Sequence, residues 1–287
     1  MEALLLSLSL ATSLVAASWP NPGPCTGNCI GIDPAAIRRS DGQYLRFNTF
    51  GKIQYYKAPS LAGPWTSQGA AIPAGSAPDV RKVGHRYILY YSVSMPNSQN
   101  SAIGYATSYT MEKGTWTDHG AVGISTMPGS NRNAIDSALF LDPSSGTYYM
   151  SFGSYWTGIW VVPMNAAATQ VAKNAVYTNI ARQPNGNGAF EGSFLVFRGG
   201  YYYLFFSAGD SGDFDPDNLP PAGQEYKIKV CRSKSVTGPY VGPVGGSCLN
   251  GNGLVLLGSH GDVYAPGGQG IFDDPKLGTV IYYHYGK

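Results

Sequence analysis

The chain has 287 residues, a length that fits one large all-β domain or two smaller domains. Charged residues make up only 13% of it, against about 25% in an average soluble domain, while Gly (38), Pro (20) and Tyr (21) are abundant. Lys and Arg exceed Asp and Glu only slightly (19 against 17) and no run of like charges occurs, so the chain lacks the electrostatic footprint of a nucleic-acid-binding protein.

The N-terminal residues 3–17 form an apolar stretch that ends in small residues, as a secretory signal peptide does. The stretch is too short to span a bilayer, which takes about 20 apolar residues. Glu2 precedes it without any Lys or Arg, so a membrane anchor or a buried N-terminal helix stays open. We predict a signal peptide over 1–17 and a secreted, extracellular mature chain over 18–287 that is not attached to a membrane.

Four cysteines permit three pairings if all of them are bridged. Cys25 with Cys29, and Cys231 with Cys248, are closest in sequence and are the pairs we expect in an oxidising compartment; four buried thiols are the alternative. The chain has no CxxC motif, no HExxH motif and only four histidines, so no zinc site built by the protein is visible.

An internal repeat organises the rest of the chain. Each copy has an acidic or small residue, a short apolar strand, a Gly turn and a strand dense in aromatic residues. The copies start at Asp33, Asp79, Asp136, Glu191 and the region 265–270, and their aromatic strands cover 42–47, 84–92, 146–152, 200–206 and 278–285. At about four strands per copy, each copy is one propeller blade. The repeat predicts an all-β, five-bladed propeller as a single domain; a β-sandwich would explain the strands but not the recurring acid.

Three of the repeated acids are candidates for catalysis. The first strand of every blade runs beside the central axis, so Asp33, Asp136 and Glu191 should face one cavity. Partial burial and mutual repulsion separate the pKa values of such carboxylates, which suits general acid and general base roles. The alternative is that each acid caps a turn. Asp79 follows Pro78 and is the member most expected to be structural, although it remains a candidate to bind a sugar hydroxyl.

Aromatic and polar residues near these acids are typical of a sugar site, in which rings stack on the sugar and polar groups bind its hydroxyls. The substrate-binding candidates are Asn133, Ser154, Tyr155, Trp156 and Phe190. A single aromatic residue is more often part of a core, but Trp156 sits in a Gly-bounded loop past a strand.

Residues 28–285 resemble glycoside hydrolase family 43, in particular its endo-1,5-α-L-arabinanase branch. The segment 31–37 (GIDPAAI) resembles the one that holds the family's general base, which carries that role to Asp33. The segment 133–159 is similar to the one with the pKa-modulating aspartate and a following aromatic loop, which matches Asp136 and Trp156. The segment 190–209 resembles the one with the general acid, which matches Glu191.

The resemblance implies an enzyme that cuts arabinan of plant cell walls with inversion at the anomeric carbon. We expect the protein to be a monomer. Asp33 would activate a water molecule while Glu191 protonates the leaving oxygen and Asp136 keeps Glu191 protonated. Space for the water requires carboxyl groups about 6.5–9.5 Å apart, against about 5–5.5 Å in a retaining pair.

The sequence departs from the family pattern in several places. Gly267-Gly268-Gln269 stands where the family has a histidine near a metal ion in the central channel, so a calcium ion stays open and no metal ligand is predicted. Ser76 stands where a tryptophan is common, and an insert with four Asp covers 209–224. The sequence ends at HYGK where relatives continue, so an incomplete last blade is expected.

Two other functions remain open. An exo-acting α-L-arabinofuranosidase or β-xylosidase would result if the 209–224 insert closed one end of the cleft. A non-catalytic carbohydrate-binding propeller would use the acids only to hold hydroxyl groups.

Overall fold

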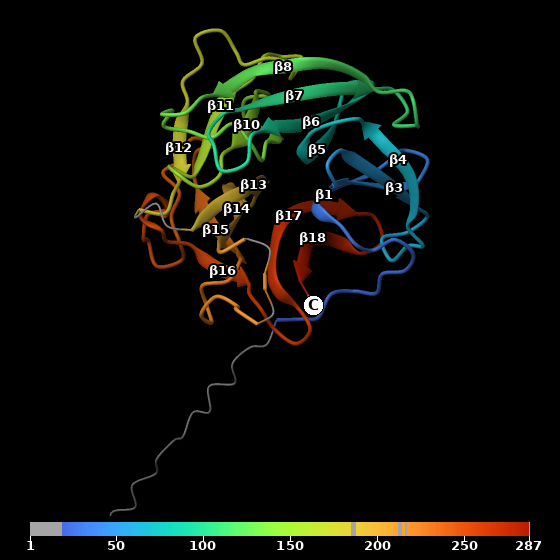
Figure 1. Cartoon of the computed structure of the whole chain (residues 1–287). Coiled ribbons are helices and arrows are strands. Elements are labelled where there is room, and N and C mark those ends of the chain that lie inside the picture. Colours follow the sequence, from blue (N-terminus) through green and yellow to red (C-terminus); the bar gives the residue numbers. More distant parts are fainter. Residues whose placement is uncertain (1–18, 185–187, 212–213, 216, 287) are drawn as a thin grey trace, which may run out of the picture.

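The computed structural model describes residues 19–184, 188–211, 214–215 and 217–286, and the predicted signal peptide lies outside them. The described residues form an all-β propeller, whose sheets stand around a central axis (Figure 1). The all-β propeller prediction is confirmed. Among these residues no helix has the length and apolar character needed to cross a membrane.

Four of the sheets have four strands each in the described part of the chain, and neighbouring strands are antiparallel. The first sheet contains β1 (Ile32–Arg38), β2 (Tyr44–Thr49), β3 (Ile53–Ala58) and β4 (Thr66–Ile72). The second contains β5 (Ser76–Val83), β6 (Arg86–Ser94), β7 (Ser101–Ser108) and β8 (Thr117–Thr126). The third contains β9 (Ala138–Leu141), β10 (Tyr148–Phe152), β11 (Ile159–Pro163) and β12 (Thr178–Ala181). The fourth contains β13 (Ala189–Arg198), β14 (Tyr201–Gly209), β15 (Lys227–Ser233) and β16 (Leu254–Leu257).

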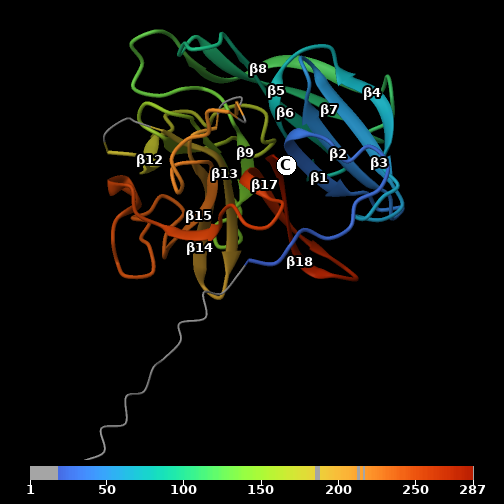
Figure 2. The ribbon, with the colours of Figure 1, turned by 60° about the horizontal axis from the view of Figure 1, so that its bottom comes forward.

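The last sheet pairs only β17 (Tyr264–Asp274) with β18 (Gly278–Gly286) among the described residues. It stands next to β1, between the fourth sheet and the first (Figure 2). The Tyr44 hydroxyl of β2 donates a hydrogen bond to the Asp274 carboxylate of β17, and both residues are buried. Side chains of the first and last sheets therefore bond to each other.

Apolar side chains fill the space between neighbouring sheets. Leu45 and Phe47 from β2 pack with Leu89 from β6, and Ile88 from β6 packs with Met150 and Phe152 from β10. Ile159 and Val161 from β11 pack with Leu204 and Phe206 from β14. The aromatic strands predicted from the repeat are thus the second strands of their sheets, and their side chains form the contacts between sheets.

The inner strands β1, β5, β13 and β17 are irregular in register, whereas β9 pairs regularly. The pairing register shifts between Ile32 and Ala35 in β1, between Ser76 and Asp79 in β5, and between Glu191 and Phe194 in β13, and two shifts occur in β17. A residue with positive φ lies at or near each shift: Asp33 (47°), Ala77 (45°), Gly192 (56°), Ala265 (50°) and Gly268 (60°), with Asp136 (56°) just before β9. Such bulges redirect side chains at the rim of a sheet. A left-handed residue other than Gly costs about 1–3 kcal/mol, so surrounding contacts must hold it.

Two disulfides have the predicted pairing. Cys25 bonds Cys29, with 6.0 Å between their Cα atoms, and Cys231 bonds Cys248, with 6.6 Å. The second bond attaches β15 to the 3-10 turn η1 (Cys248–Asn250), which packs beside β12.

Candidate active site

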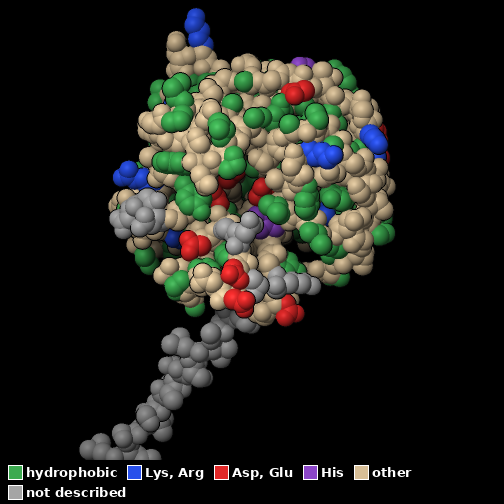
Figure 3. Space-filling view, viewed as in Figure 1, with side chains coloured by type: hydrophobic (Ala, Val, Ile, Leu, Met, Phe, Trp, Pro, Cys, Tyr) green, Lys and Arg blue, Asp and Glu red, His purple; other side chains and the backbone are tan. Residues whose placement is uncertain are grey.

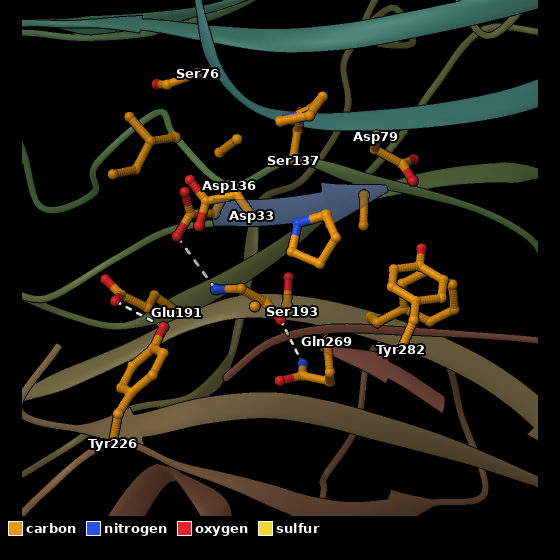
Figure 4. A pocket seen from close by; sticks show the side chains of 18 residues that line it. Asp33, Ser76, Asp79, Asp136, Ser137, Glu191, Ser193, Tyr226, Gln269 and Tyr282 are labelled. Carbon is orange, nitrogen blue, oxygen red and sulfur yellow. Dashed lines mark hydrogen bonds between the residues drawn. The ribbon is translucent and has the colours of Figure 1, made fainter. Parts of the chain in front are cut away.

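Three carboxylates from three different sheets line one cavity of about 240 Å³ at the central axis. They belong to Asp33 on β1, Asp136 before β9 and Glu191 on β13, and Figure 4 shows their side chains gathered on one side of this cavity. Acidic side chains and a histidine are visible at the bottom of a central hollow in Figure 3. The bulges in β1 and β13, and the left-handed Asp136 before β9, lie where the acids meet although these are far apart in the sequence.

Asp33 is the most accessible of the three acids, with 35% of its side chain exposed. Its Oδ2 accepts a hydrogen bond from Thr49 Oγ1 at 2.9 Å. Its backbone N–H donates to His284 Nδ1 at 3.0 Å. Both contacts hold a residue whose φ is 47°. Asp33 therefore presents a fixed carboxylate to solvent in the cavity.

Glu191 is only 9% exposed. The Tyr226 hydroxyl donates to Glu191 Oε1 at 2.8 Å, and the Ser154 hydroxyl donates to Glu191 Oε2. Burial raises the pKa of Glu191, the charge of Asp33 raises it further, and the two hydroxyl donors oppose this rise without cancelling it. A carboxyl group that keeps its proton at higher pH and has a fixed direction suits the role of general acid.

Asp136 lines the same cavity, and Figure 4 shows its carboxylate next to that of Asp33. Its N–H donates to Ser92 Oγ at 3.1 Å, and its Oδ2 accepts from Gly192 N at 3.2 Å. Burial raises the pKa of Asp136 well above its usual value, and the charges of Glu191 and Asp33 add to the rise. Asp136 and Glu191 therefore titrate as a pair that retains a proton beyond the range of an isolated carboxyl group.

We expect Asp136→Asn to move the basic limb of the kcat/KM pH profile to lower pH and to lower kcat by about 10²-fold. The reason is that Asn cannot share a proton with Glu191, so Glu191 should lose its proton at lower pH than the coupled pair does. The measurement is a pH profile on linear arabinan, with the exposed Asp215→Asn as the matched control. An unchanged basic limb in Asp136→Asn would show that the two groups do not share a proton.

The same variant should have a higher Tm than the wild type at pH 7. Because folding raises the pKa of Asp136, the folded state binds more protons than the unfolded state, and stability decreases as pH rises above the unfolded pKa. Asn does not ionise, so the variant does not lose stability in this way as the pH rises. The Tm difference should vanish below about pH 3, where both the folded and the unfolded wild type are protonated at Asp136.

A second hollow of about 830 Å³ adjoins the first, and both are lined by Ile135 and Glu191. Tyr155 and Trp156 form one wall, with 37% and 42% exposure, and the segment 94–98 after β6 also lines the hollow. The Tyr155 hydroxyl lies 3.2 Å from Ser211 Oγ, so the described start of the 209–224 insert borders this loop. The acids therefore open onto a larger surface with exposed aromatic rings.

Two of the predicted substrate-binding residues, Ser154 and Asn133, have polar groups that already bond within the protein. Ser154 and Asn133 also line the second hollow, but Ser154 donates to Glu191 and Asn133 Oδ1 accepts from Ser101 Oγ at 2.7 Å. Both side chains are buried and already bonded within the protein.

Asp79 lines the first cavity, but its carboxylate is engaged in structure. Its Oδ2 accepts from Arg81 Nε at 3.0 Å and from Leu139 N at 2.8 Å, which joins the second sheet to the third. The sequence analysis favoured a structural role for Asp79 over binding of a sugar hydroxyl, and these contacts fit the structural role.

Phe190 does not belong to the cleft, which corrects the sequence interpretation. It is 3% exposed and packs on Phe206 with 4.7 Å between ring centroids. Successive side chains of a strand point to opposite faces, so the neighbour of an inward-facing Glu191 faces away from the cavity.

Two functional positions were missed from the sequence. Tyr226 precedes β15 and His284 lies on β18, and their rings stack with centroids 6.0 Å apart and an interplanar angle of 10°. One bonds Glu191 and the other bonds the backbone of Asp33. Neither has a local signal: Tyr226 stands alone before the strand β15, and His284 lies in a run of aromatic strand residues.

The residues at the implied metal position do not form a ligand set. Gln269 Oε1 accepts from Ser207 Oγ at 2.8 Å, and Gln269 Nε2 donates to Gly192 O at 2.6 Å, so both ends of the amide are occupied. The Nδ1 atom of His284 is occupied by the N–H of Asp33. Within the described ranges, no group of three or more His, Cys, Asp or Glu is arranged to hold a metal ion. No reaction step below passes through a metal.

Comparisons with known proteins show the family of the chain. The sequence profile described as glycosyl hydrolases family 43 matches residues 26–287. "Probable arabinan endo-1,5-alpha-L-arabinosidase A" of Aspergillus fumigatus is 52% identical, and the alignment covers 94% of this chain and 87% of that protein.

Solved structures show the same similarity. A GH43 endo-arabinanase from Bacillus licheniformis has a TM-score of 0.77 and 28% identity, covering 91% of this chain and 96% of that one. The Cellvibrio cellulosa α-L-arabinanase complexed with arabinohexaose has a TM-score of 0.78 and 26% identity, covering 89% and 87%. The resemblance seen in the sequence is confirmed: the chain belongs to glycosyl hydrolase family 43.

Proposed function

We propose that this protein is a secreted endo-acting hydrolase of α-1,5-L-arabinan that inverts the anomeric configuration. The observation that carries the proposal is the placement of Asp33, Asp136 and Glu191 in one cavity beside a larger hollow with exposed aromatic rings. The names of the relatives, which describe arabinan endo-1,5-α-L-arabinosidases, support the substrate and the mode of attack.

In the proposed reaction Asp33 accepts a proton from a water molecule, whose oxygen forms a bond to the anomeric carbon. The bond from that carbon to the glycosidic oxygen breaks, and Glu191 gives its proton to the leaving oxygen. The exposure of Asp33 suits a group that must reach water, and the raised pKa of Glu191 suits a group that must keep its proton until the bond breaks. Asp136 shares a proton with Glu191, and in the proposed reaction that proton is on Glu191 while Asp136 is ionised.

The endo mode is supported by the extent of the surface beside the acids. The second hollow continues past Glu191 to the segment 94–98 and to Trp156, which offers sites for further sugars of a chain. The test is incubation of the mature protein with linear arabinan, arabinobiose and xylan, followed by sizing of the products. Oligosaccharides of intermediate length from arabinan support the proposal, while monosaccharide alone would replace it with the exo-acting alternative, and no product would favour the binding propeller.

Trp156→Ala should raise KM for linear arabinan about three- to tenfold while kcat changes less than twofold. The exposed indole ring lies on the wall of the second hollow, away from the reacting carboxylates, so its loss weakens binding of the chain equally before and during reaction. Tyr109→Ala is the control, because Tyr109 is 76% exposed and lines neither hollow. An unchanged KM would remove Trp156 from the substrate site.

The proposal also includes the architecture and location of the protein. We propose that β17 and β18 form a fifth blade, supported by their place between the fourth sheet and the first. We propose a monomer without a required metal ion, exported by the signal peptide at 1–17, with arabinan side chains of plant cell walls as the partner. N-terminal sequencing of the exported protein tests the cleavage, and turnover after treatment with a chelator tests the metal.

A further inference from the structure

A side-chain acceptor holds the left-handed residue at several junctions between sheets. Ala77 N donates to Thr49 Oγ1 at 2.8 Å, Asp136 N to Ser92 Oγ at 3.1 Å, and Gly268 N to Ser207 Oγ at 2.9 Å. In each case the acceptor lies on the second strand of the preceding sheet: β2, β6 and β14. These contacts fix the turn that aims each inner strand at the axis.

His284 occupies the equivalent place at the junction between the last sheet and the first. It lies on β18, the second strand of the last sheet, and its Nδ1 accepts the N–H of Asp33 at 3.0 Å across 251 residues of sequence. An imidazole therefore replaces the hydroxyl acceptor of the other three junctions. The residue that it holds is the proposed catalytic base.

The surroundings of His284 fix its ring and its tautomer. Tyr226 stacks on the ring, and a Cβ at Gly268 would lie 2.7 Å from its Nδ1 and Cε1 atoms, so the absence of a side chain at 268 makes room for the imidazole. Because Nδ1 accepts a hydrogen bond from Asp33 N–H, it carries no hydrogen, and the neutral ring must be protonated at Nε2. Burial lowers the pKa of His284, which favours this neutral form, although the charge of Asp33 partly opposes the shift.

We propose that His284 is a positioning residue for Asp33, and that Gly268 is required because its missing side chain leaves space for the imidazole. The ring holds the peptide of Asp33 in its left-handed conformation and so sets the direction of the carboxylate toward the attacking water. This inference rests on the proposed hydrolase function, in which Asp33 is the base.

The first experiment compares His284→Ala with His284→Asn. Alanine removes the acceptor, and kcat on linear arabinan should fall about 10²-fold while KM changes less than twofold, because a misdirected base impairs reaction more than binding. The Oδ1 atom of asparagine replaces Nδ1 as acceptor, so His284→Asn should recover kcat to within about fivefold of the wild type. Equal losses in the two variants, or a change confined to KM, would overturn the proposal.

Two controls separate positioning from general damage. His260→Leu removes a histidine whose ring nitrogens contact backbone carbonyls of Gly258 and Pro20 outside the cavity, and it should leave kcat unchanged. Thermal unfolding of every variant reports on folding. If His284→Ala fails to fold, His284→Asn and Gly268→Ala still test the proposal.

A double-mutant cycle tests the role of Gly268. Gly268→Ala alone should displace the ring and lower kcat about as much as His284→Ala. In the His284→Ala background the imidazole that a Cβ at 268 would strike is absent. Adding Gly268→Ala there should therefore change kcat less than threefold, although alanine at this positive φ lowers the stability of the fold. Losses that multiply would contradict the proposal.

A readout independent of activity distinguishes this inference from the proposed function. In the ¹⁵N NMR spectrum of the wild type, His284 should show an unprotonated Nδ1 and a protonated Nε2 near neutral pH. A protonated Nδ1 would overturn the positioning contact even if the enzyme cleaves arabinan. Failure of the wild type to cleave any polysaccharide, with this tautomer present, would instead overturn the proposed function and with it the role of Asp33 as base.

Discussion

Replacing Glu191 with Gln is expected to lower kcat on linear α-1,5-arabinan by about 10²- to 10⁴-fold, the contribution of a general acid, with little change in KM. Gln keeps the size of the side chain but has no proton to give to the leaving oxygen. Steady-state kinetics and the affinity for an arabino-oligosaccharide measure the two effects separately. A hydrolase loses turnover and keeps binding, whereas a binding propeller would lose affinity or nothing.

The leaving group provides a sharper test of this role. An aryl arabino-oligosaccharide releases an acidic phenol that needs no protonation, so Glu191→Gln should lose much less activity on it than on arabinan. Glu225→Gln is the matched control, because it makes the same change at a carboxylate that lines neither hollow. If both substrates lost the same factor, Glu191 would not be the general acid.

The fold was predictable because the repeat is simple. Aromatic strands such as 200–206 recur after a Gly turn, and the structure uses them as second strands whose side chains fill the space between sheets. The convergence of Asp33, Asp136 and Glu191 was predictable for the same reason, since equivalent places in a propeller face one axis.

The direction of individual side chains was harder to predict. Phe190 was placed in the sugar site by its closeness to Glu191, although alternation along a strand sends the two side chains to opposite faces. That signal was present in the sequence. The bulge after Glu191, which breaks the alternation further along β13, was not visible in the pattern.

The contact between His284 and Asp33 could not be predicted from the local sequence pattern. The sequence context of His284, YYHY, indicates only an aromatic strand, and its partner Asp33 is 251 residues away. The sequence did show that the segment 265–270 lacks a histidine, but it gave no sign that glycine at 268 makes room for one from the adjacent strand. Which glycine of β17 lies against His284 of β18 can be known only from the register of the two strands.

Asp33→Asn should lower kcat on arabinan by about 10²- to 10⁴-fold, because the amide does not accept a proton from water. Azide should restore part of the turnover on an activated aryl arabino-oligosaccharide, since an anionic nucleophile needs no base. Its nitrogen then forms a bond to the anomeric carbon from the side of the attacking water while the bond to the aryl oxygen breaks.

The configuration of the azide product decides the stereochemical proposal. An inverting pair converts an α-L-arabinofuranoside into a β-L-arabinofuranosyl azide, which proton NMR distinguishes from the α product. Asp262→Asn, an exposed carboxylate outside the cavity, should behave as the wild type and yield no azide product. An α-configured azide, the product of retention, would mean that Glu191 first forms a covalent bond to the anomeric carbon and that azide then displaces it, and this would overturn the inverting mechanism.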